Sequence, residues 1–434
     1  MLGILGGGIS GLALAYLYEG ESQVLEKEDR IGGHCRSHQK DGFWFDEGGH
    51  ILFSRDEDVL GRMLGVLGDN VERRRRNNKI WYKRRFVKYP FENGLDALDK
   101  EDVFDCLYSY LNNDYPEPTN FKEWIYHTFG KGIAERYLIP YNEKIWKTSL
   151  HRMTTDWAGG RVPKPPAEDV IKSALGISTE GYTHQLYYYY PREGGFEALP
   201  KALADAAVPR CNIRTGFAAK SVRREAGRWI VSDGSEEHAY ERLVSTIPVQ
   251  DFVELLEGVP GYVQRAVQGL RFNPSVFVML GLEDCLAKDI NAVYFPQPEL
   301  VFHRVCFMHT FADGLTPPGK LCAVGEISCR GEDENWLADD ETIVRKVVDG
   351  LAGEGFFEPS QVVATDVRRV RHSYVVYDHA HRRNADIIRS YCDELGIDLL
   401  GRMSQFEYWN TDQCFAEAMR LAERLNSGVG ALRS

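Results

Sequence analysis

Short apolar runs, separated by glycine-rich or charged turns, predict a strand, a helix and a second strand at the start of the chain. Leu2–Leu5 is short and apolar, as is typical of a buried parallel strand. A glycine-rich turn at 6–11 follows, and the apolar, alanine-rich run at 12–17 predicts a helix. Residues 23–25 predict the second strand, which ends at Glu26. This order is that of a dinucleotide-binding βαβ unit.

The rest of the chain contains helical and strand-like patterns without an internal repeat. Helical periodicity occurs at 102–111, 121–129 and 415–425. Strand-like runs occur at 275–280, 320–324 and 397–401. We therefore expect a mixed α/β protein in which helix-rich and strand-rich regions follow one another along the sequence.

The turn at 6–11 has the pattern G-x-G-x-x-G, and each glycine in it meets a physical requirement. The first allows a tight turn, the second lets the backbone approach a pyrophosphate, and the third packs the helix closely on the strand. The helix N-terminus then offers free N–H groups and a partial positive charge to phosphates. An acidic residue at the end of the second strand can accept from ribose hydroxyls. We expect cofactor contacts from Gly6, Gly8, Ile9, Ser10, Gly11, Glu26 and Lys27.

Length and composition are those of an ordinary globular protein. A chain of 434 residues is too long for one simple core and suits two or three lobes. Its 43% hydrophobic and 27% charged residues are typical of soluble proteins. The net charge of -12 argues against nucleic-acid binding, because such surfaces are usually basic. Basic residues gather at 73–76 and 83–85, which form either a solvated face or a local anion site.

The nine cysteines are scattered, with no C-x-x-C pair and no spacing typical of zinc ligands, so we expect no metal site. The apolar stretch 1–18 lacks a basic leading segment and carries the nucleotide-loop glycines, which argues against a signal peptide. No segment reaches the roughly 18 uninterrupted apolar residues that a membrane helix needs. These features predict free thiols, a cytoplasmic location and no membrane span.

The segment Arg30-Ile31-Gly32-Gly33-His34-Cys35-Arg36-Ser37 resembles the second glycine motif of a large FAD superfamily. That superfamily includes amine oxidases and protoporphyrinogen oxidases. The resemblance implies FAD rather than NAD, with Gly33, His34 and Arg36 close to the pyrophosphate. Gly194–Leu199 resembles the loop and helix through which such flavoproteins return to the FAD domain. The implied architecture therefore interleaves the FAD domain with substrate lobes.

Two further segments resemble the flavin side of UDP-galactopyranose mutases, and the eukaryotic-type branch of that family most closely. Residues 46–54 resemble the loop in which a glycine–histidine pair lies beside the isoalloxazine. Residues 401–408 resemble the family's closing glycine–arginine motif, and residues 410–412 would cap the final helix near the flavin pyrimidine ring. The flavin contacts that the resemblance implies are Gly48, Gly49, His50, Arg402, Asn410, Thr411 and Asp412.

Other segments resemble the substrate side of the same family. They are Tyr89–Asn93 preceded by Arg76, Pro140–Trp146 followed by Arg161-Val162-Pro163, Tyr294-Phe295-Pro296 followed by Arg304, and His372–Tyr374. In the family, the first of these surrounds the uracil, the tryptophan walls the sugar pocket, and tyrosines and an arginine hold the diphosphate. The implied substrate contacts are Arg76, Tyr89, Phe91, Glu92, Trp146, Gln185, Tyr294, Arg304, Tyr374, Tyr377 and Tyr408. The implied catalytic set is His50, Arg161, Arg304, Tyr374 and Tyr408.

Three departures from the family pattern concern the substrate. Glu92 stands where the eukaryotic branch usually has glutamine. A carboxylate only accepts hydrogen bonds, so it could take a uracil N–H but would also suit a base that presents more donors. Val375 replaces the usual proline after Tyr374, and Tyr377 competes for the same assignment. The surroundings of Gln185 also differ, and the sequence leaves the base and the sugar open.

The resemblance implies an α/β fold in which a Rossmann-like FAD-binding domain is interleaved with a helical lobe and an antiparallel β-sheet substrate domain. The expected FAD-binding domain comprises 1–75, 190–250 and 365–434. The expected helical substrate lobe is 95–185, and the expected β-sheet domain comprises 76–94 and 251–364.

The activity implied by the resemblance is that of a FAD-dependent sugar-nucleotide pyranose–furanose mutase. In the family, N5 of the reduced flavin attacks the anomeric carbon and displaces the nucleoside diphosphate. The alternatives are an oxidoreductase of the protoporphyrinogen oxidase or amine oxidase type, and a protein that binds FAD without turnover. The chain has no second dinucleotide loop for NAD(P)H, so the reductant stays open, as does the oligomeric state.

Overall fold

The predicted first strand lies at the centre of a five-stranded parallel sheet. The computed structural model describes residues 1–158, 161–162, 164–181 and 183–433, with side chains as far as Ser427. This sheet gathers strands from the beginning, middle and end of the chain. In spatial order they are β19 (Ile397–Leu399), β13 (Arg242–Ser245), β1 (Leu2–Leu5), β2 (Ser22–Leu25) and β9 (Cys211–Arg214).

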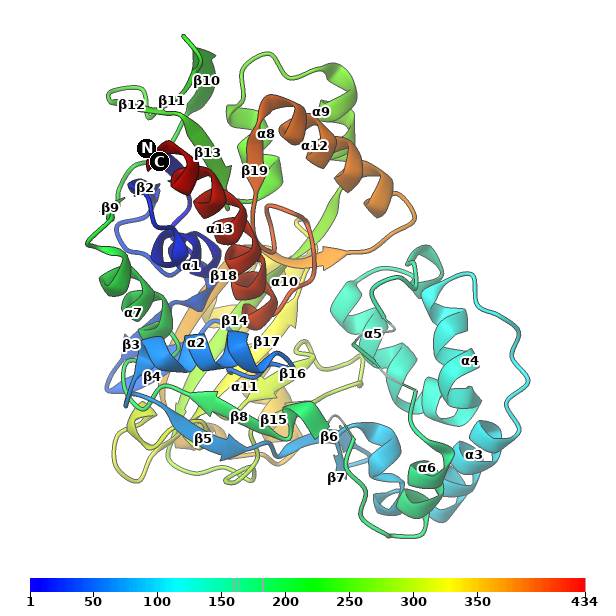
Figure 1. The fold of residues 1–434 in the computed structure, drawn as a ribbon. Helices are drawn as coiled ribbons and strands as arrows, with labels where there is room; N and C mark the ends of the chain where they lie inside the picture. The colour runs from blue at the N-terminus through cyan, green and yellow to red at the C-terminus, as the bar shows by residue number, and fades with distance from the viewer. Residues whose placement is uncertain (159–160, 163, 182, 434) are drawn as a thin grey trace.

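Both faces of the parallel sheet are covered, because its strands are apolar on both sides. One face carries three helices: α1 (Ile9–Leu17), α7 (Ala198–Ala207) and α13 (Thr411–Arg433). Figure 1 shows α13 beside α1. The other face carries an antiparallel ribbon and three helices: β10 (Ser221–Glu225), β11 (Arg228–Ser232), β12 (Glu237–Tyr240), α8 (Val249–Leu255), α9 (Gly261–Gln268) and α12 (His381–Leu395).

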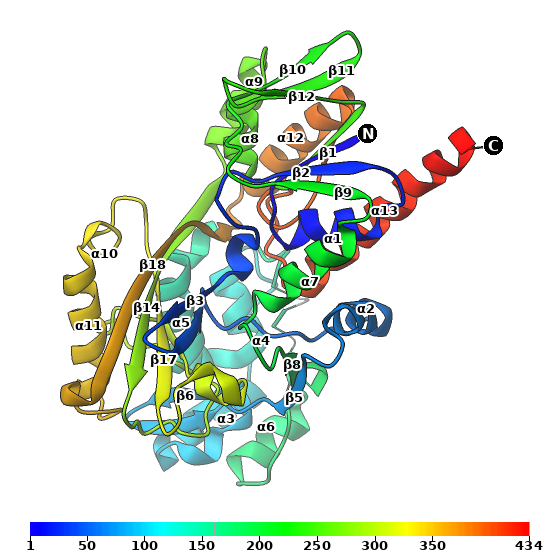
Figure 2. The ribbon, with the colours of Figure 1, turned by 90° about the vertical axis from the view of Figure 1, so that its left-hand side faces the viewer.

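The second large sheet has seven strands. Its order is β18 (Val362–Val376), β14 (Arg271–Leu282), β17 (Leu321–Ser328), β16 (Arg304–Cys306), β15 (Ala292–Tyr294), β6 (Asn78–Tyr82) and β7 (Arg85–Lys88). The neighbouring strands are antiparallel except β15 and β6, which are parallel. Figure 2 shows two helices along its outer side, α10 (Glu334–Leu337) and α11 (Asp340–Gly353). The sheet is therefore antiparallel, as expected, apart from that one pair.

A helical lobe packs against the β6–β7 edge of this sheet (Figure 1). Its elements are α3 (Lys100–Leu111), α4 (Phe121–Ile133), a π-helical turn (Ala134–Leu138), α5 (Ile139–Trp146) and α6 (Ala167–Ala174). The remaining elements are α2 (Glu57–Leu67) and two small antiparallel ribbons, β3 (Ser37–Lys40) with β4 (Phe43–Asp46), and β5 (Glu72–Arg75) with β8 (Tyr187–Tyr190). Among the described residues, no helix is long and apolar enough to cross a bilayer.

The structure confirms the predicted fold class and the elements predicted from periodicity. The helices predicted at 102–111, 121–129 and 415–425 lie within α3, α4 and α13, and the strands predicted at 275–280, 320–324 and 397–401 coincide with β14, β17 and β19. β18 runs across the domain boundary expected at residue 365. We propose the same three-part division, with that boundary moved to the end of β18.

Gly11 allows the first helix to sit directly on the glycine turn. A methyl group at this position would lie 2.2 Å from the carbonyl oxygen of Gly6, a backbone atom that cannot move aside. Gly6 itself has a φ of 103°, which favours glycine. By contrast, Gly61 on the exposed side of α2 has nothing within 4 Å of such a methyl group.

We predict that Gly11→Ala lowers the free energy of unfolding by about 3 kcal/mol or more, because the helix must move off the sheet. Gly61→Ala is the matched control and should stabilise by roughly 0.5–1 kcal/mol through helix propensity. Urea denaturation of both variants measures the difference. Equal stability of the two variants would show that the close approach at Gly11 is unimportant.

Candidate functional site

A cavity of about 580 Å³ brings together residues from the whole length of the chain. Its wall includes the loop after β4, the ends of β15, β16 and β18, helix α5, and the start of α13. The sequence-predicted residues that line it are Gly49, Arg76, Tyr89, Glu92, Trp146, Arg161, Gln185, Tyr294, Arg304, Tyr374, Tyr408, Asn410 and Asp412.

One buried carboxylate aligns an arginine and a tyrosine on this wall. β16 pairs with β17 so that Arg304 lies opposite Glu326 in register. Nε and Nη2 of Arg304 donate to one carboxylate oxygen of Glu326 at 2.9 and 2.5 Å. The hydroxyl of Tyr374 donates to the other oxygen at 2.5 Å. Glu326 is buried and does not itself line the cavity.

The Glu326–Arg304 pair stays ionised over the physiological pH range. Burial favours the neutral acid, but the guanidinium of Arg304 and the hydroxyl of Tyr374 outweigh it and lower the pKa of Glu326 to about 2. Burial also opposes the charge of Arg304, yet Glu326 holds the Arg304 pKa well above its usual value. Burial and then Glu326 raise the Tyr374 pKa well above its ordinary range, so Tyr374 acts as a hydrogen-bond donor.

Two further guanidinium groups flank Tyr408. The guanidinium carbon of Arg161 lies 3.9 Å from the centre of the Tyr408 ring, and that of Arg402 lies 4.5 Å from it. These are cation–π distances, and both cations lie beside the phenol edge of the cavity. Arg161 also donates to the backbone carbonyl of Tyr408. Tyr408, Arg161 and Arg304 therefore line this end of the cavity, and Arg402 contacts the Tyr408 ring without lining it.

Trp146 closes the cavity at the end of α5. Its indole N–H donates to the side-chain oxygen of Asn142, one turn earlier in the helix, at 3.0 Å. Its ring meets three aromatic rings edge-on: Trp157 at 4.9 Å, Tyr408 at 5.5 Å and Tyr374 at 6.0 Å between centroids. Such edge-to-face packing fixes the indole plane and leaves a rigid apolar wall.

Arg76 lies at the opposite side, after β5. One of its guanidinium nitrogens donates to the side-chain oxygen of Gln185. The amide orientation that satisfies Asn78 places its oxygen 2.9 Å from Nε of Arg76. The ring of Tyr89 stacks on that of Tyr294 at 4.6 Å, and Arg76 lies 5.6 Å from the Tyr89 ring. Neutral groups thus orient Arg76 and leave its charge available to an anion.

Two predicted substrate contacts lie behind the cavity wall. Phe91 is fully buried and stacks on Tyr137 in the helical lobe, because its ring completes that core. The Tyr377 hydroxyl accepts from the backbone N–H of Tyr408 at 2.6 Å and donates to Glu407 at 2.8 Å. Of the two competing tyrosines, Tyr374 therefore faces the cavity, and Tyr377 supports Tyr408 from behind. Pro163 lies outside the described residues.

The predicted nucleotide turn has the expected local geometry. Glu26 at the end of β2 accepts from the N–H of Gly7 at 2.7 Å and of Glu28 at 2.9 Å. The second glycine segment lies against the first, since a methyl group on Gly33 would be 3.1 Å from the Cα of Gly8. Further predicted cofactor residues lie beside this turn and away from the cavity: Ile9, Ser10, Lys27, His34, Arg36, Arg402 and Thr411.

His50 lies at the junction between the nucleotide turn side and the cavity. Its ring stacks on Phe196 at 5.1 Å between centroids. Burial lowers the His50 pKa to about 4, so the imidazole is neutral at physiological pH. Its Nδ1 atom is buried and has no hydrogen-bond partner among the described residues. A buried, unpartnered nitrogen of this kind is suited to a bound group with a polar edge.

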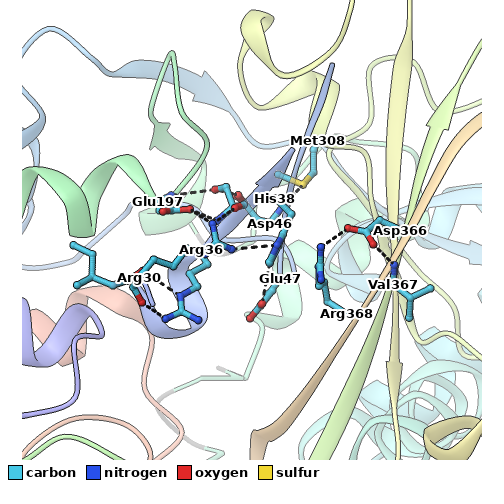
Figure 3. A network of polar contacts seen from close by, with 12 residues as sticks. Arg30, Arg36, His38, Asp46, Glu47, Glu197, Met308, Asp366, Val367 and Arg368 are labelled. Atoms are coloured by element: carbon cyan, nitrogen blue, oxygen red, sulfur yellow. Dashed lines mark hydrogen bonds and ion pairs between the residues drawn. The ribbon is translucent and has the colours of Figure 1, made fainter. Parts of the chain in front are cut away.

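A polar network holds the loops on the cofactor side in place (Figure 3). Asp46 accepts from the hydroxyls of Ser37 at 2.5 Å and Tyr190 at 2.6 Å, and burial raises its pKa to about 7. Glu197 accepts from the backbone N–H of Ser37 at 3.0 Å and from Arg30 at 3.3 Å. These bonds tie the segment after the second glycine motif to the loop before His50 and to α7.

The described residues contain no group of three His, Cys, Asp or Glu side chains arranged to hold a metal ion. All nine cysteines fall in the described part of the chain, and each is a buried, free thiol. Burial raises the pKa of Cys306, which lies against Gly49, to about 11. These thiols are therefore protonated packing groups in this structure.

The sequence-family model of flavin-containing amine oxidoreductases matches residues 9–391 of the chain. The chain belongs to this family. FAD is accordingly its cofactor, and the residues present fit that group on three counts. The glycine turn and Glu26 have the geometry of a dinucleotide site, the second glycine segment lies against the turn, and the unpartnered nitrogen of His50 offers a partner to a flavin edge.

Solved structures of other proteins share the fold of this chain. The crystal structure of reduced UDP-galactopyranose mutase has a TM-score of 0.89 at 22% identity and covers 98% of this chain and 95% of its own. A putative protoporphyrinogen oxidase from Exiguobacterium sp. 255-15 has a TM-score of 0.77 at 19% identity, with 98% of each chain covered. A putrescine oxidase variant has a TM-score of 0.67 at 16% identity, again with 98% of each chain covered.

One curated protein matches a short segment of this chain. It is an uncharacterized protein in the nifH2 3' region of Methanothermococcus thermolithotrophicus, 40% identical over 63 residues. The match spans 14% of this chain and 62% of that protein's length.

Four residues that shape the cavity are not among the site residues predicted from the sequence. Asn78 and Asn142 orient the functional side chains, and Trp157 lines the cavity beside Trp146, but nothing in the local pattern distinguishes them. Glu326 had a usable signal: it is a lone charge inside the apolar run of β17, and such a residue is rarely buried unless it is paired.

We predict that Glu326→Gln lowers the free energy of unfolding by about 3 kcal/mol at neutral pH, because it leaves the half-buried Arg304 charge without its partner. The folded-state pKa of Glu326 lies below its ordinary value of 4.5. Its stabilisation is therefore present above pH 4.5 and is lost as the pH falls toward about 2.

Urea denaturation between neutral and acidic pH measures both effects. Glu283→Gln, which breaks a surface pair with Lys320, is the matched control and should cost less than about 1 kcal/mol. An acid-induced loss of stability that is the same in Glu326→Gln and in the unmodified protein would contradict the assignment.

Proposed function

We propose that the chain is a FAD-dependent mutase that interconverts the pyranose and furanose forms of a sugar nucleotide, as UDP-galactopyranose mutase does. The observation that carries this proposal is the cluster of arginines and tyrosine hydroxyls in the cavity wall, centred on Arg304, Tyr374 and Tyr408. An amine does not need such a cluster, whereas a diphosphate does. The shared fold with reduced UDP-galactopyranose mutase, at a TM-score of 0.89, supports the same interpretation.

The cluster suits a diphosphate that must leave the sugar and return to it. Arg304 keeps a fixed orientation because Glu326 holds two of its N–H groups, and its remaining donors are free to reach an anion. We propose that the hydroxyl of Tyr408 adds a donor around the same group, and that Tyr294 and Tyr374 line its binding site. The single O–H of Tyr374 already donates to Glu326. Donors that are already oriented stabilise growing negative charge without reorganisation.

The remaining residues of the cavity would position the flavin and the sugar. Reduced FAD, when bound, supplies a nucleophilic nitrogen for the anomeric carbon and is regenerated at the end of the cycle. We propose that His50, with its unpartnered buried Nδ1, orients the flavin edge. The fixed indole of Trp146 would wall the sugar, and Arg161, stacked on Tyr408, would close the diphosphate end. These residues hold the reacting atoms together.

A second candidate is a flavin-dependent oxidoreductase of the amine oxidase or protoporphyrinogen oxidase type. The match of residues 9–391 to the flavin-containing amine oxidoreductase model favours it. The fold shared with a putative protoporphyrinogen oxidase, at a TM-score of 0.77, is compatible with it. The two candidates differ in whether electrons leave the flavin during turnover, which is directly measurable.

We predict that the dithionite-reduced holoenzyme converts UDP-galactose, or another sugar nucleotide, to its furanose form under anaerobic conditions. The oxidised holoenzyme should show no turnover, because the oxidised flavin is not nucleophilic. Chromatographic separation of the two sugar nucleotides measures this. Oxygen consumption with an amine or a porphyrinogen, and no interconversion of any sugar nucleotide tested, would establish the oxidoreductase instead.

We predict that Arg304→Lys weakens sugar-nucleotide binding about 10- to 100-fold while flavin content stays unchanged, because lysine keeps the charge beside Glu326 but loses the paired donors. Arg304→Ala should abolish binding. Calorimetric titration and the flavin absorbance measure the two quantities. Arg383→Ala, on the exposed face of α12, is the matched control. Loss of flavin in Arg304→Lys with retained nucleotide binding would contradict the assignment.

A further inference from the structure

The last turn of α5 is attached to the seven-stranded sheet, although the rest of the helix belongs to the helical lobe. The last carbonyl groups of an α-helix have no hydrogen-bond partner within the helix. In α5, side chains of the sheet supply these partners. Ser328 of β17 donates to the carbonyl of Ile145 at 2.6 Å, and Asn273 of β14 donates to that of Trp146 at 2.6 Å. The cavity residue Trp146 is therefore held from the sheet side.

Lys144 adds a second link from the same turn, through its side chain. Its Nζ atom donates to the carbonyl oxygens of Phe295 at 3.0 Å and Gln297 at 2.6 Å. Both residues belong to the loop between β15 and β16, which starts after Tyr294 and ends before Arg304. The loop thus joins two residues that line the cavity. Lys144 therefore connects α5 to the part of the wall where we propose that the diphosphate binds.

The loop that Lys144 contacts is also held at other points. The backbone N–H of Phe295 donates to the carbonyl of His303 at 2.9 Å, which closes the base of the loop. The side-chain amide of Gln297 donates to the carbonyl of Trp81 in β6 at 2.9 Å. Since the sheet fixes the loop, the two bonds from Lys144 determine the position of α5 and not that of the loop.

Packing alone does not account for a lysine at this position. Lys144 is only 9% exposed, and it does not line the cavity. Burial lowers the Lys144 pKa to about 7. Lys147 and Glu299 are the charged groups that act on it, and no carboxylate in the described part of the chain forms an ion pair with it. An apolar side chain of similar volume would avoid the cost of burying the amine. The two hydrogen bonds to the loop are therefore the feature that requires a lysine.

We propose that Lys144 is a positioning residue, which sets where the indole of Trp146 lies relative to Arg304. This inference rests on the proposed function, in which the sugar lies against Trp146 and the diphosphate lies at Arg304. Lys144 lies behind the cavity wall and acts through the last turn of α5. A displacement of about 1 Å in such a wall can lower the rate of the chemical step about 100-fold.

The first measurement observes the indole directly and needs no substrate. The chain has eight tryptophans, and in holoenzyme labelled with 5-fluorotryptophan the ¹⁹F resonance of Trp146 is identified by its loss in Trp146→Phe. Lys144→Met keeps the size of the side chain and removes both donors, so it should shift or broaden that resonance. The resonance of Trp229, in β11 of the other large domain, should stay unchanged. Lys144→Gln keeps two N–H donors on a shorter side chain and should give a smaller shift.

The second measurement is turnover of UDP-galactose by the dithionite-reduced holoenzyme. Lys144→Met should lower kcat about 100-fold and change the affinity for UDP by less than about 3-fold, because Arg304 keeps its own partner Glu326. In a Trp146→Phe background the same substitution should have a much smaller effect, since the displaced wall is already altered. Lys172→Met, at the surface of α6, is the matched control and should leave kcat unchanged.

The outcomes separate this inference from the proposed function. An unchanged Trp146 resonance in folded Lys144→Met, or an equal loss of kcat in both backgrounds, would overturn the positioning role and leave the mutase intact. If Lys144→Met does not fold, an unchanged resonance in Lys144→Gln would overturn that role equally. A displaced resonance, combined with no furanose formation by the unmodified protein, would overturn the mutase and leave Lys144 as the residue that places Trp146.

Discussion

The buried ion pair between Glu326 and Arg304 is the constraint on which the cavity depends. Removing two charges from water is costly, and only close geometry with further hydrogen bonds offsets that cost. The pairing of β16 with β17 supplies the geometry, and the hydroxyl of Tyr374 supplies the further bond. The same pair therefore keeps the guanidinium charged and fixes the position of Tyr374 in the cavity wall.

On the cofactor side, the loops are held mainly by close contacts between backbone segments. Gly11 lets α1 rest on the turn at Gly6, and the segment at Gly33 lies against Gly8. The hydrogen bonds of Asp46 then tie these loops to the segment that carries His50. Since His50 and Arg304 contribute to adjoining regions, the glycine loops and the ion pair together shape the boundary between the nucleotide turn and the cavity.

Much of this could be predicted from the sequence, because the controlling patterns are local. The turn at 6–11 and the acid at Glu26 have a fixed spacing, so the βαβ unit follows directly. The positions of Phe91 and Tyr377 could not be predicted, because whether a ring faces a cavity or a core depends on packing between distant elements. Glu326 was missed for a related reason: its partners lie 22 and 48 residues away, so no local motif contains them.

In the proposed mutase reaction, the bond between the sugar and the diphosphate breaks and re-forms while the arginines and tyrosines of the cavity wall hold the diphosphate. Positional isotope exchange tests it most directly, with UDP-galactose that carries ¹⁸O in the bridge between the anomeric carbon and the phosphate. The account predicts that the reduced holoenzyme moves the label into non-bridging positions of the β-phosphate, and that the oxidised holoenzyme does not. Furanose formation with the label retained in the bridge would contradict it.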